Sequence, residues 1–227
     1  MKISTLSLLP ILALLLSACG GKPPAPDWKK DSISLIGKYK KAELKGENKL
    51  AERYFEQALA AAGSAGKLEE TARLHLIHCA TRQASLVFEP CTAYQDIAKM
   101  SPDTEDETYH RFITGQWDST ANKLDNSKLP VQYRDYYASL ESAKPYAGLE
   151  KIADPLSRLI AISIALQRKQ ADDAMLNLAA NTASEQGWRK PLLVYLKLLE
   201  NRATLKTDNA QVTSLRARIK LVEDSMQ

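Results

Sequence analysis

Apolar residues recur every three or four positions along most of this 227-residue chain, which is the spacing of amphipathic α-helices. From residue 31 onward the pattern restarts about every 12 to 20 residues, so short helices separated by turns are expected. The predicted helices cover residues 31–45, 50–62, 68–86, 91–100, 103–115, 129–143, 155–166, 171–186, 192–202 and 209–222.

Turn and cap residues stand where these helices should begin and end. Gly46 and Gly187 each follow the last apolar position of a predicted helix, as C-terminal glycines do. Asp154 precedes Pro155, which combines an N-cap side chain with a proline in the first turn. The local signals therefore support the helix boundaries that the apolar spacing predicts.

Composition favours the same fold class. The chain has 32 Leu and 30 Ala but only 5 Val, and strands prefer β-branched residues. Hydrophobic residues make up 44% and charged residues 26%, which is ordinary for a folded protein. The net charge of +4 is too small to indicate nucleic-acid binding. We therefore predict an all-α protein, an irregular α-solenoid of antiparallel helix pairs.

The first residues have the features of a secretory signal. Lys2 provides a positive charge and Leu6–Leu16 is an apolar run that is too short for a stable membrane-spanning helix. The sequence Leu16-Ser17-Ala18-Cys19 then resembles the lipobox of bacterial lipoproteins. The remaining alternative is an ordinary signal peptide followed by a chance cysteine. Residues 1–18 are interpreted as the signal peptide and are left out of the fold prediction.

The lipoprotein resemblance implies a lipid anchor. In that family the signal is cleaved before the cysteine, which here is Cys19, and the cysteine is acylated on its sulfur and its new amino group. Gly20 in the next position implies the outer membrane, facing the periplasm, although export to the cell surface stays open. Residues 19–30, which contain Pro23, Pro24 and Pro26, then form a lipidated tether.

The first two predicted helices resemble one tetratricopeptide unit. Gly46 opens the turn, Ala51 and Ala58 are small residues, and Phe55 is an aromatic residue in the second helix. The first helix departs from the family pattern, since Tyr39 stands where a small residue is preferred. The resemblance implies a tetratricopeptide-like repeat domain over residues 31–227, with possible halves at 31–100 and 154–227 joined by the more polar stretch 101–145.

Two cysteines and two histidines are candidates for structural chemistry. Cys79 and Cys91 are the other cysteines, and a pair in an oxidising compartment predicts a disulfide, with two buried thiols as the alternative. His75 and His78 share a helix face beside Cys79, but no second cluster completes a zinc site. We therefore expect no metal and no other cofactor.

Three tyrosines, Tyr133, Tyr136 and Tyr137, lie close together in one predicted helix. Exposed tyrosines are frequent anchors at protein interfaces, so they are candidate partner-binding residues, and a place in the core is the alternative. Lysines give residues 22–49 a net charge of +4, which fits either a solvated helix face or a contact with anionic lipid or an acidic partner.

The sequence contains no recognisable catalytic constellation. The hypothesis is therefore a non-catalytic scaffold or adaptor, anchored by acylated Cys19, that binds another envelope protein. An envelope enzyme such as a cell-wall hydrolase and an envelope-stability protein without a single client are the alternatives.

Overall fold

The structure, a computed structural model, describes residues 24–118, 120–142 and 145–226. Within these ranges the chain forms eleven α-helices and one 3-10 helix and contains no β-strand. The elements are α1 (Asp27–Lys45), α2 (Asn48–Gly63), α3 (Leu68–Gln83), α4 (Thr92–Ala98), α5 (Thr104–Ile113), η1 (Asn126–Lys128), α6 (Val131–Glu141), α7 (Pro145–Leu149), α8 (Pro155–Gln167), α9 (Asp173–Glu185), α10 (Arg189–Leu205) and α11 (Asn209–Asp224). The signal sequence and Cys19 lie outside the described residues.

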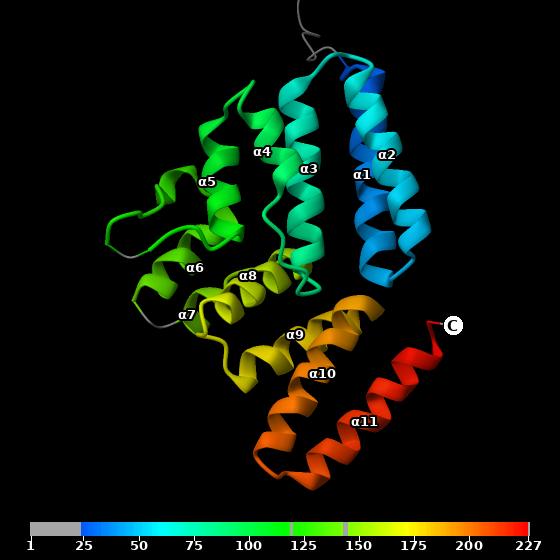
Figure 1. The fold of residues 1–227 in the computed structure, drawn as a ribbon, viewed down its shortest axis with the longest axis vertical. Coiled ribbons are helices and arrows are strands. Elements are labelled where there is room, and N and C mark those ends of the chain that lie inside the picture. Colours follow the sequence, from blue (N-terminus) through cyan, green and yellow to red (C-terminus); the bar gives the residue numbers. More distant parts are fainter. Residues whose placement is uncertain (1–23, 119, 143–144, 227) are drawn as a thin grey trace, which may run out of the picture.

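Several successive helices pack against each other as pairs, among them α1 with α2, α3 with α4, α9 with α10 and α10 with α11 (Figure 1). Helices α1 and α2 form a hairpin on one side of α3, and α4 and α5 lie on the other side. Helices α8, α9, α10 and α11 continue the stack below them and end at the C-terminus. The prediction of an all-α, solenoid-like fold built from helix pairs is confirmed.

Capping residues explain why several helices begin where they do. The carboxylate of Asp103 accepts hydrogen bonds from the backbone amides of Glu105 and Asp106 at the start of α5. The Asp154 carboxylate accepts one from Ser157, with Pro155 in the first turn of α8. A side-chain acceptor replaces a helical partner that these amides lack, so local sequence sets the boundary.

Other boundaries differ from the prediction. Helix α1 begins at Asp27 rather than Asp31, because Pro26 provides the last extended residue and Asp27 places a negative charge in the first turn. Helix α10 begins at Arg189, before the predicted start at residue 192. The short elements η1 and α7 were not predicted, because three to five residues are too few to show helical periodicity.

The α1–α2 hairpin has a small core of its own. Tyr39 of α1 and Leu74 of α3 pack with Ala51 and Ala58 of α2, all of them buried. Small side chains at Ala51 and Ala58 let the helices approach closely, which is the role that the tetratricopeptide resemblance implies for them. Gly46 ends α1 with φ of 81°, a left-handed conformation that favours glycine.

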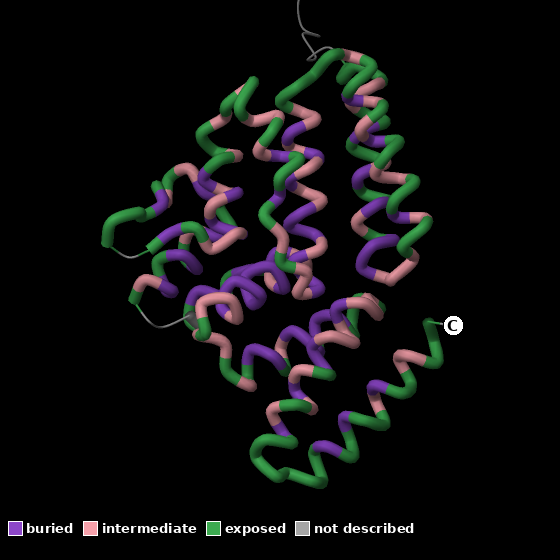
Figure 2. Tube along the Cα trace, viewed as in Figure 1, coloured by how far each residue is buried: buried purple, intermediate pink, exposed green. Residues whose placement is uncertain are grey.

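The main core extends through most of the remaining chain, from Leu44 to Ile219. The segment 101–145, expected to be a polar connection, contributes the buried aromatic residues Phe112 and Trp117 to it. Both possible halves, 31–100 and 154–227, therefore contribute residues to this core, while the α1–α2 hairpin keeps its own. Figure 2 shows the buried positions on the inner faces of the helices and the exposed ones on the outer faces.

Arg189 joins the C-terminal ends of α1 and α11. Its guanidinium donates hydrogen bonds to the carbonyl oxygens of Lys45, at 3.1 Å, and Ser225, at 2.7 Å. It also lies 3.6 Å from the carboxylate of Glu47. One side chain at the start of α10 thus holds the end of α1 beside the end of α11, which places α10 next to the hairpin (Figure 1).

Candidate functional site

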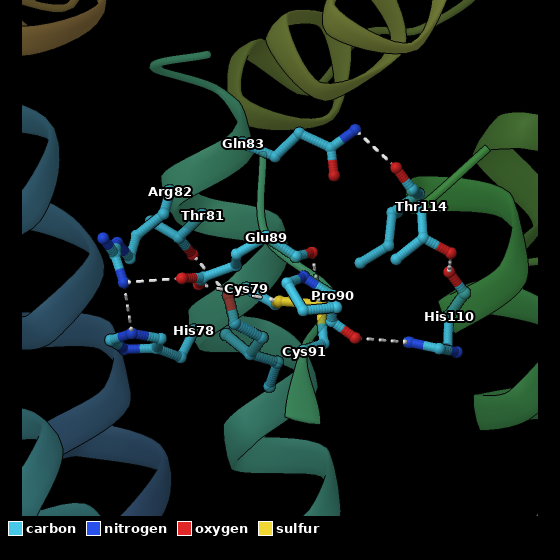
Figure 3. Close-up of a disulfide and its surroundings, with 12 residues drawn as sticks. His78, Cys79, Thr81, Arg82, Gln83, Glu89, Pro90, Cys91, His110 and Thr114 are labelled. Atoms are coloured by element: carbon cyan, nitrogen blue, oxygen red, sulfur yellow. Dashed lines mark hydrogen bonds and ion pairs between the residues drawn. A yellow bond between two sulfur atoms is a disulfide. The ribbon is translucent and has the colours of Figure 1, made fainter. Parts of the chain in front are cut away.

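A disulfide connects α3 to the segment that precedes α4. Cys79 near the end of α3 is bonded to Cys91, and their Cα atoms are 5.9 Å apart (Figure 3). Cys91 has a left-handed backbone with φ of 57°, and Leu86 has φ of 60°. The predicted pairing of Cys79 with Cys91 is confirmed. The bond holds residues 89–91 against the side of α3.

Helix α5 supports the same loop from its other side. His110 Nε2 lies 3.3 Å from the carbonyl oxygen of Pro90, and the Gln83 amide donates a hydrogen bond of 2.7 Å to the Ile113 carbonyl (Figure 3). The disulfide and the His110 contact hold the residues that follow Glu89, and the Gln83 bond joins α3 to α5. Glu89 is therefore positioned by covalent and polar contacts rather than by a regular element.

Arg82 stands between Glu89 and His78. Its Nη1 donates to the Glu89 carboxylate at 2.9 Å and lies 3.5 Å from His78 Nε2 (Figure 3). All three side chains are partly buried. The arrangement is a short polar row across the lower part of α3, next to the disulfide.

Aromatic rings cover the surface of α3 that faces the hairpin. The ring of Phe55 lies 4.3 Å from that of His78 and 5.4 Å from that of His75, measured between centroids. Tyr39 stacks on His78 at 5.2 Å, and its hydroxyl donates to the His78 carbonyl oxygen at 3.3 Å. His75 and His78, considered above as metal ligands, thus pack among aromatic rings.

Two neighbouring hollows open on either side of this ring cluster. The first, of about 320 Å³, lies between Phe55, His75, His78 and Arg82 on one wall and residues 89–94 on the other. The second, of about 520 Å³, is lined by Tyr39, Glu43, Asn48, Glu52, Phe55, Glu56, Leu59, His78, Arg82 and Lys190. They share Phe55, His78 and Arg82, and together they are called the α2–α3 groove below.

The two walls of the α2–α3 groove carry opposite charges. Glu52 and Glu56 line it from α2, one helical turn apart, and both are exposed. Arg82 lines it from α3 and Lys190 from α10. Lys190 is paired with the carboxylate of Glu43, so α10 also contributes a charged residue to a site formed mainly by the hairpin.

Burial lowers the pKa of His78 to about 4, with smaller contributions from the positive charges of Arg82, His75 and Lys190. Burial also lowers the pKa values of His75 and His110. The imidazole of His78 is therefore neutral at neutral pH. Burial raises the pKa of the Tyr39 hydroxyl far above its ordinary value, so it remains a hydrogen-bond donor.

A pH dependence of stability follows from His78. The unfolded chain takes up this proton near pH 6.5 and the folded chain only near pH 4, so the unfolded state holds more protons between these values. The free energy of unfolding should therefore fall as the pH drops from 6.5 toward 4. We expect a lower urea midpoint at pH 5 than at pH 7.5, and a smaller difference for His78→Phe. An unchanged difference in that variant would contradict the prediction.

The described residues offer no group of three or more His, Cys, Asp or Glu side chains placed to hold a metal ion. Cys79 and Cys91 are bonded to each other and not available as thiolate ligands. What the groove offers chemically is recognition: aromatic surface, four glutamate side chains and a neutral imidazole line two adjoining hollows.

The three tyrosines are not surface anchors. Tyr133, Tyr136 and Tyr137 are buried, and the expectation that they present an exposed partner-binding surface is wrong. The three tyrosines and Leu140 are spaced as one face of helix α6, and this face packs against the main core. The Tyr136 hydroxyl donates to the Ala161 carbonyl oxygen at 2.7 Å, and the Tyr137 hydroxyl accepts a hydrogen bond from the Leu124 amide at 3.1 Å.

The lysines near the N-terminus are divided between paired and solvated positions. Lys29 lies 3.3 Å from Glu70, and Lys30 lies 3.2 Å from Asp27. The ammonium group of Lys38 lies 5.7 Å from the ring centroid of Tyr54. Lys41 is exposed on the same helix. Whether this surface contacts anionic lipid stays a prediction.

Sequence reasoning missed most of the groove. His75, His78 and Arg82 follow each other at intervals of three and four, so their common face on α3 was readable from the sequence. Lys190 is 147 residues from Glu43, and no local pattern connects them. Glu52 and Glu56 have the spacing of an ordinary solvated face, and only the packing of α2 beside α3 places them in a concave region.

The fold and groove define an all-α, solenoid-like protein with one disulfide among its described residues. The sequence matches no protein-family model, no curated protein and no solved structure.

Across the described helices, no segment combines the length and the apolar character that a bilayer span requires.

Proposed function

We propose that this chain is a lipid-anchored scaffold or adaptor that faces the periplasm and binds another protein of the bacterial envelope, without catalysing a reaction. The observation that carries the proposal is the α2–α3 groove, which offers aromatic surface and charged side chains in one concave region. Grooves between helices are common sites for partner segments. The disulfide agrees with an oxidising compartment such as the periplasm.

The anchor part of the proposal rests on Leu16-Ser17-Ala18-Cys19 and its resemblance to a lipobox. Three acyl chains on Cys19 exceed the roughly two that stable anchoring requires. Gly20 favours the outer membrane over the inner membrane under this resemblance. The domain would then begin only a few residues from the lipid, because α1 starts at Asp27.

The anchor is tested by replacing Cys19 with alanine. We expect the wild-type protein in the outer-membrane fraction, with an N-terminal peptide whose mass corresponds to acylated Cys19. The Cys19→Ala form should lose both properties, because no sulfur is available for the lipid. The matched control is Cys79→Ala with Cys91→Ala, which removes cysteines but leaves the lipobox. A processed, membrane-bound Cys19→Ala protein would contradict the proposal.

The adaptor part is tested in the cells that make the protein. Photo-crosslinking amino acids are placed singly at exposed positions of several helices, and crosslinked products are identified by mass spectrometry. A reproducible envelope protein crosslinked from one contiguous surface supports an adaptor. Purified protein that degrades peptidoglycan, and loses this activity when a single carboxylate or serine is replaced, would overturn the proposal in favour of an enzyme.

A further inference from the structure

We propose that the α2–α3 groove binds a segment of a partner protein that presents a lysine or arginine next to a bulky apolar side chain. This inference rests on the proposed adaptor function and names the surface and the chemistry of the partner. It is argued from the charged side chains and aromatic rings of the groove, and from which of these charges are already paired within the protein.

Two of the negative side chains of the groove, those of Glu52 and Glu56, are not engaged. Within the part of the chain that the structure describes, neither Glu52 nor Glu56 forms an ion pair or a side-chain hydrogen bond. Both are exposed and both line the second hollow. Lys49 and Arg53 lie on the same helix but do not line the hollow, and no ion pair joins them to either glutamate. Two carboxylates therefore line a concave surface without a cationic partner of their own.

The positive side chains opposite them are already engaged. Arg82 is paired with Glu89 at 2.9 Å, and Lys190 is paired with the buried carboxylate of Glu43. His78 adds no charge at neutral pH, because burial holds its pKa near 4. The charge left over in the groove is negative, although the whole chain carries +4. Charge complementarity thus selects a cationic group as the ligand.

Apolar surface lies directly beside these carboxylates. Phe55 and Leu59 stand on the same face of α2 and are only partly buried. On the other side of Phe55, the first hollow continues between His75 and the disulfide. A bulky apolar side chain there would contact rings and sulfur, while a neighbouring cation reached Glu52 and Glu56. A small cation would contact the carboxylates but leave the apolar surface uncovered. Anionic lipid or nucleic acid would be repelled by the unpaired carboxylates of Glu52 and Glu56.

The first experiment locates the contact. A photo-crosslinking amino acid replaces Asn48, which is exposed and lines the second hollow, so that both carboxylates are kept. In a separate protein it replaces Gln132, which lines a hollow of about 220 Å³ formed by α1, α3, α5, α6 and α8. We expect a partner from position 48, and we expect the crosslinked segment to contain a lysine or arginine within four residues of a bulky apolar residue. A partner captured only from position 132 would overturn this inference and leave the adaptor function standing. Failure at every surface position would count against both.

The second experiment measures the charges. The crosslinked segment is synthesised with a fluorescent label, and its affinity for the purified protein is measured by anisotropy. Glu52→Gln with Glu56→Gln should weaken binding by about 3- to 10-fold, because exposed ion pairs are individually weak. The matched control is Glu150→Gln with Glu185→Gln, which removes two exposed carboxylates outside the groove and should leave the affinity unchanged.

A charge exchange makes the result specific. Replacing the basic residue of the peptide with glutamate should weaken binding to the wild type, and Glu52→Lys with Glu56→Lys should restore it. Exposed side chains are changed on both sides, so folding is not at stake. If the affinity were the same for the wild-type and substituted peptides and proteins, the inference would be overturned. So would a crosslinked segment that belongs to a second copy of this chain, since the groove would then be a self-association surface.

Discussion

Replacing Tyr136 with alanine is expected to lower the free energy of unfolding by about 3–5 kcal/mol, the range for removing a large aromatic side chain from a core. The side chain has no exposed area, and its hydroxyl donates to the Ala161 carbonyl oxygen at 2.7 Å. Helix α7 packs closely on its backbone, because a Cβ added to Gly148 would lie 2.6 Å from the Tyr136 Cα. Urea unfolding followed by circular dichroism measures the loss.

Two matched variants separate the ring from the hydroxyl and the core from the surface. Tyr136→Phe keeps the ring and loses one hydrogen bond, so a loss of about 1 kcal/mol is expected. Tyr146→Ala changes an exposed tyrosine of the neighbouring α7 and should change stability by about 0.5 kcal/mol or less. If Tyr136→Ala were no more harmful than Tyr146→Ala, the buried position of Tyr136 would be refuted.

Removing the disulfide by Cys79→Ala with Cys91→Ala should lower the free energy of unfolding by about 3 kcal/mol in the loop-entropy model. The bonded residues are separated by 12 positions, so the bond closes a short loop that the reduced unfolded chain no longer contains. Alanine is used because both positions are buried and a serine hydroxyl would need a partner. The measurement compares urea midpoints of the two proteins at pH 7.5.

Reductant provides the control for this prediction. Treating the wild-type protein with reductant should lower its midpoint toward that of the double variant, and the double variant should not respond. Hydrogen exchange should increase first in residues 84–91, because these residues lie between the two bonded positions. Equal midpoints for oxidised wild-type protein and double variant would show that the bond contributes nothing to stability.

Helix boundaries were predicted best where a local interaction sets them. Asp103 and Asp154 cap their helices with their own side chains, and Gly46 ends α1 in a left-handed conformation. These interactions involve residues within a few positions of each other, so the sequence contains their full cause. The cysteine pair belongs here as well, because a compartment inferred from the N-terminus and two nearby cysteines suffice to predict it.

The tyrosines of α6 show where such reasoning ends. Their spacing with Leu140 defines one helix face, and the sequence shows that this face exists. It does not show whether another element covers it. Helix α8 contributes Leu159, Ile160 and Ile162 to the same core, and this packing makes the face internal. The groove has the same origin, since Lys190 reaches Glu43 only after α10 packs beside α1.

The sequence by itself determined that this protein is helical, where its longer helices lie to within about four residues, and which cysteines pair, and it is the basis for proposing a lipid anchor at Cys19. Each of these depends on residues close together in the chain. Only the tertiary structure decided which helix faces are internal and that α2, α3 and α10 enclose a groove with unpaired carboxylates. Contacts between distant segments depend on how all helices pack at once, and a local pattern of apolar spacing contains no information about that arrangement.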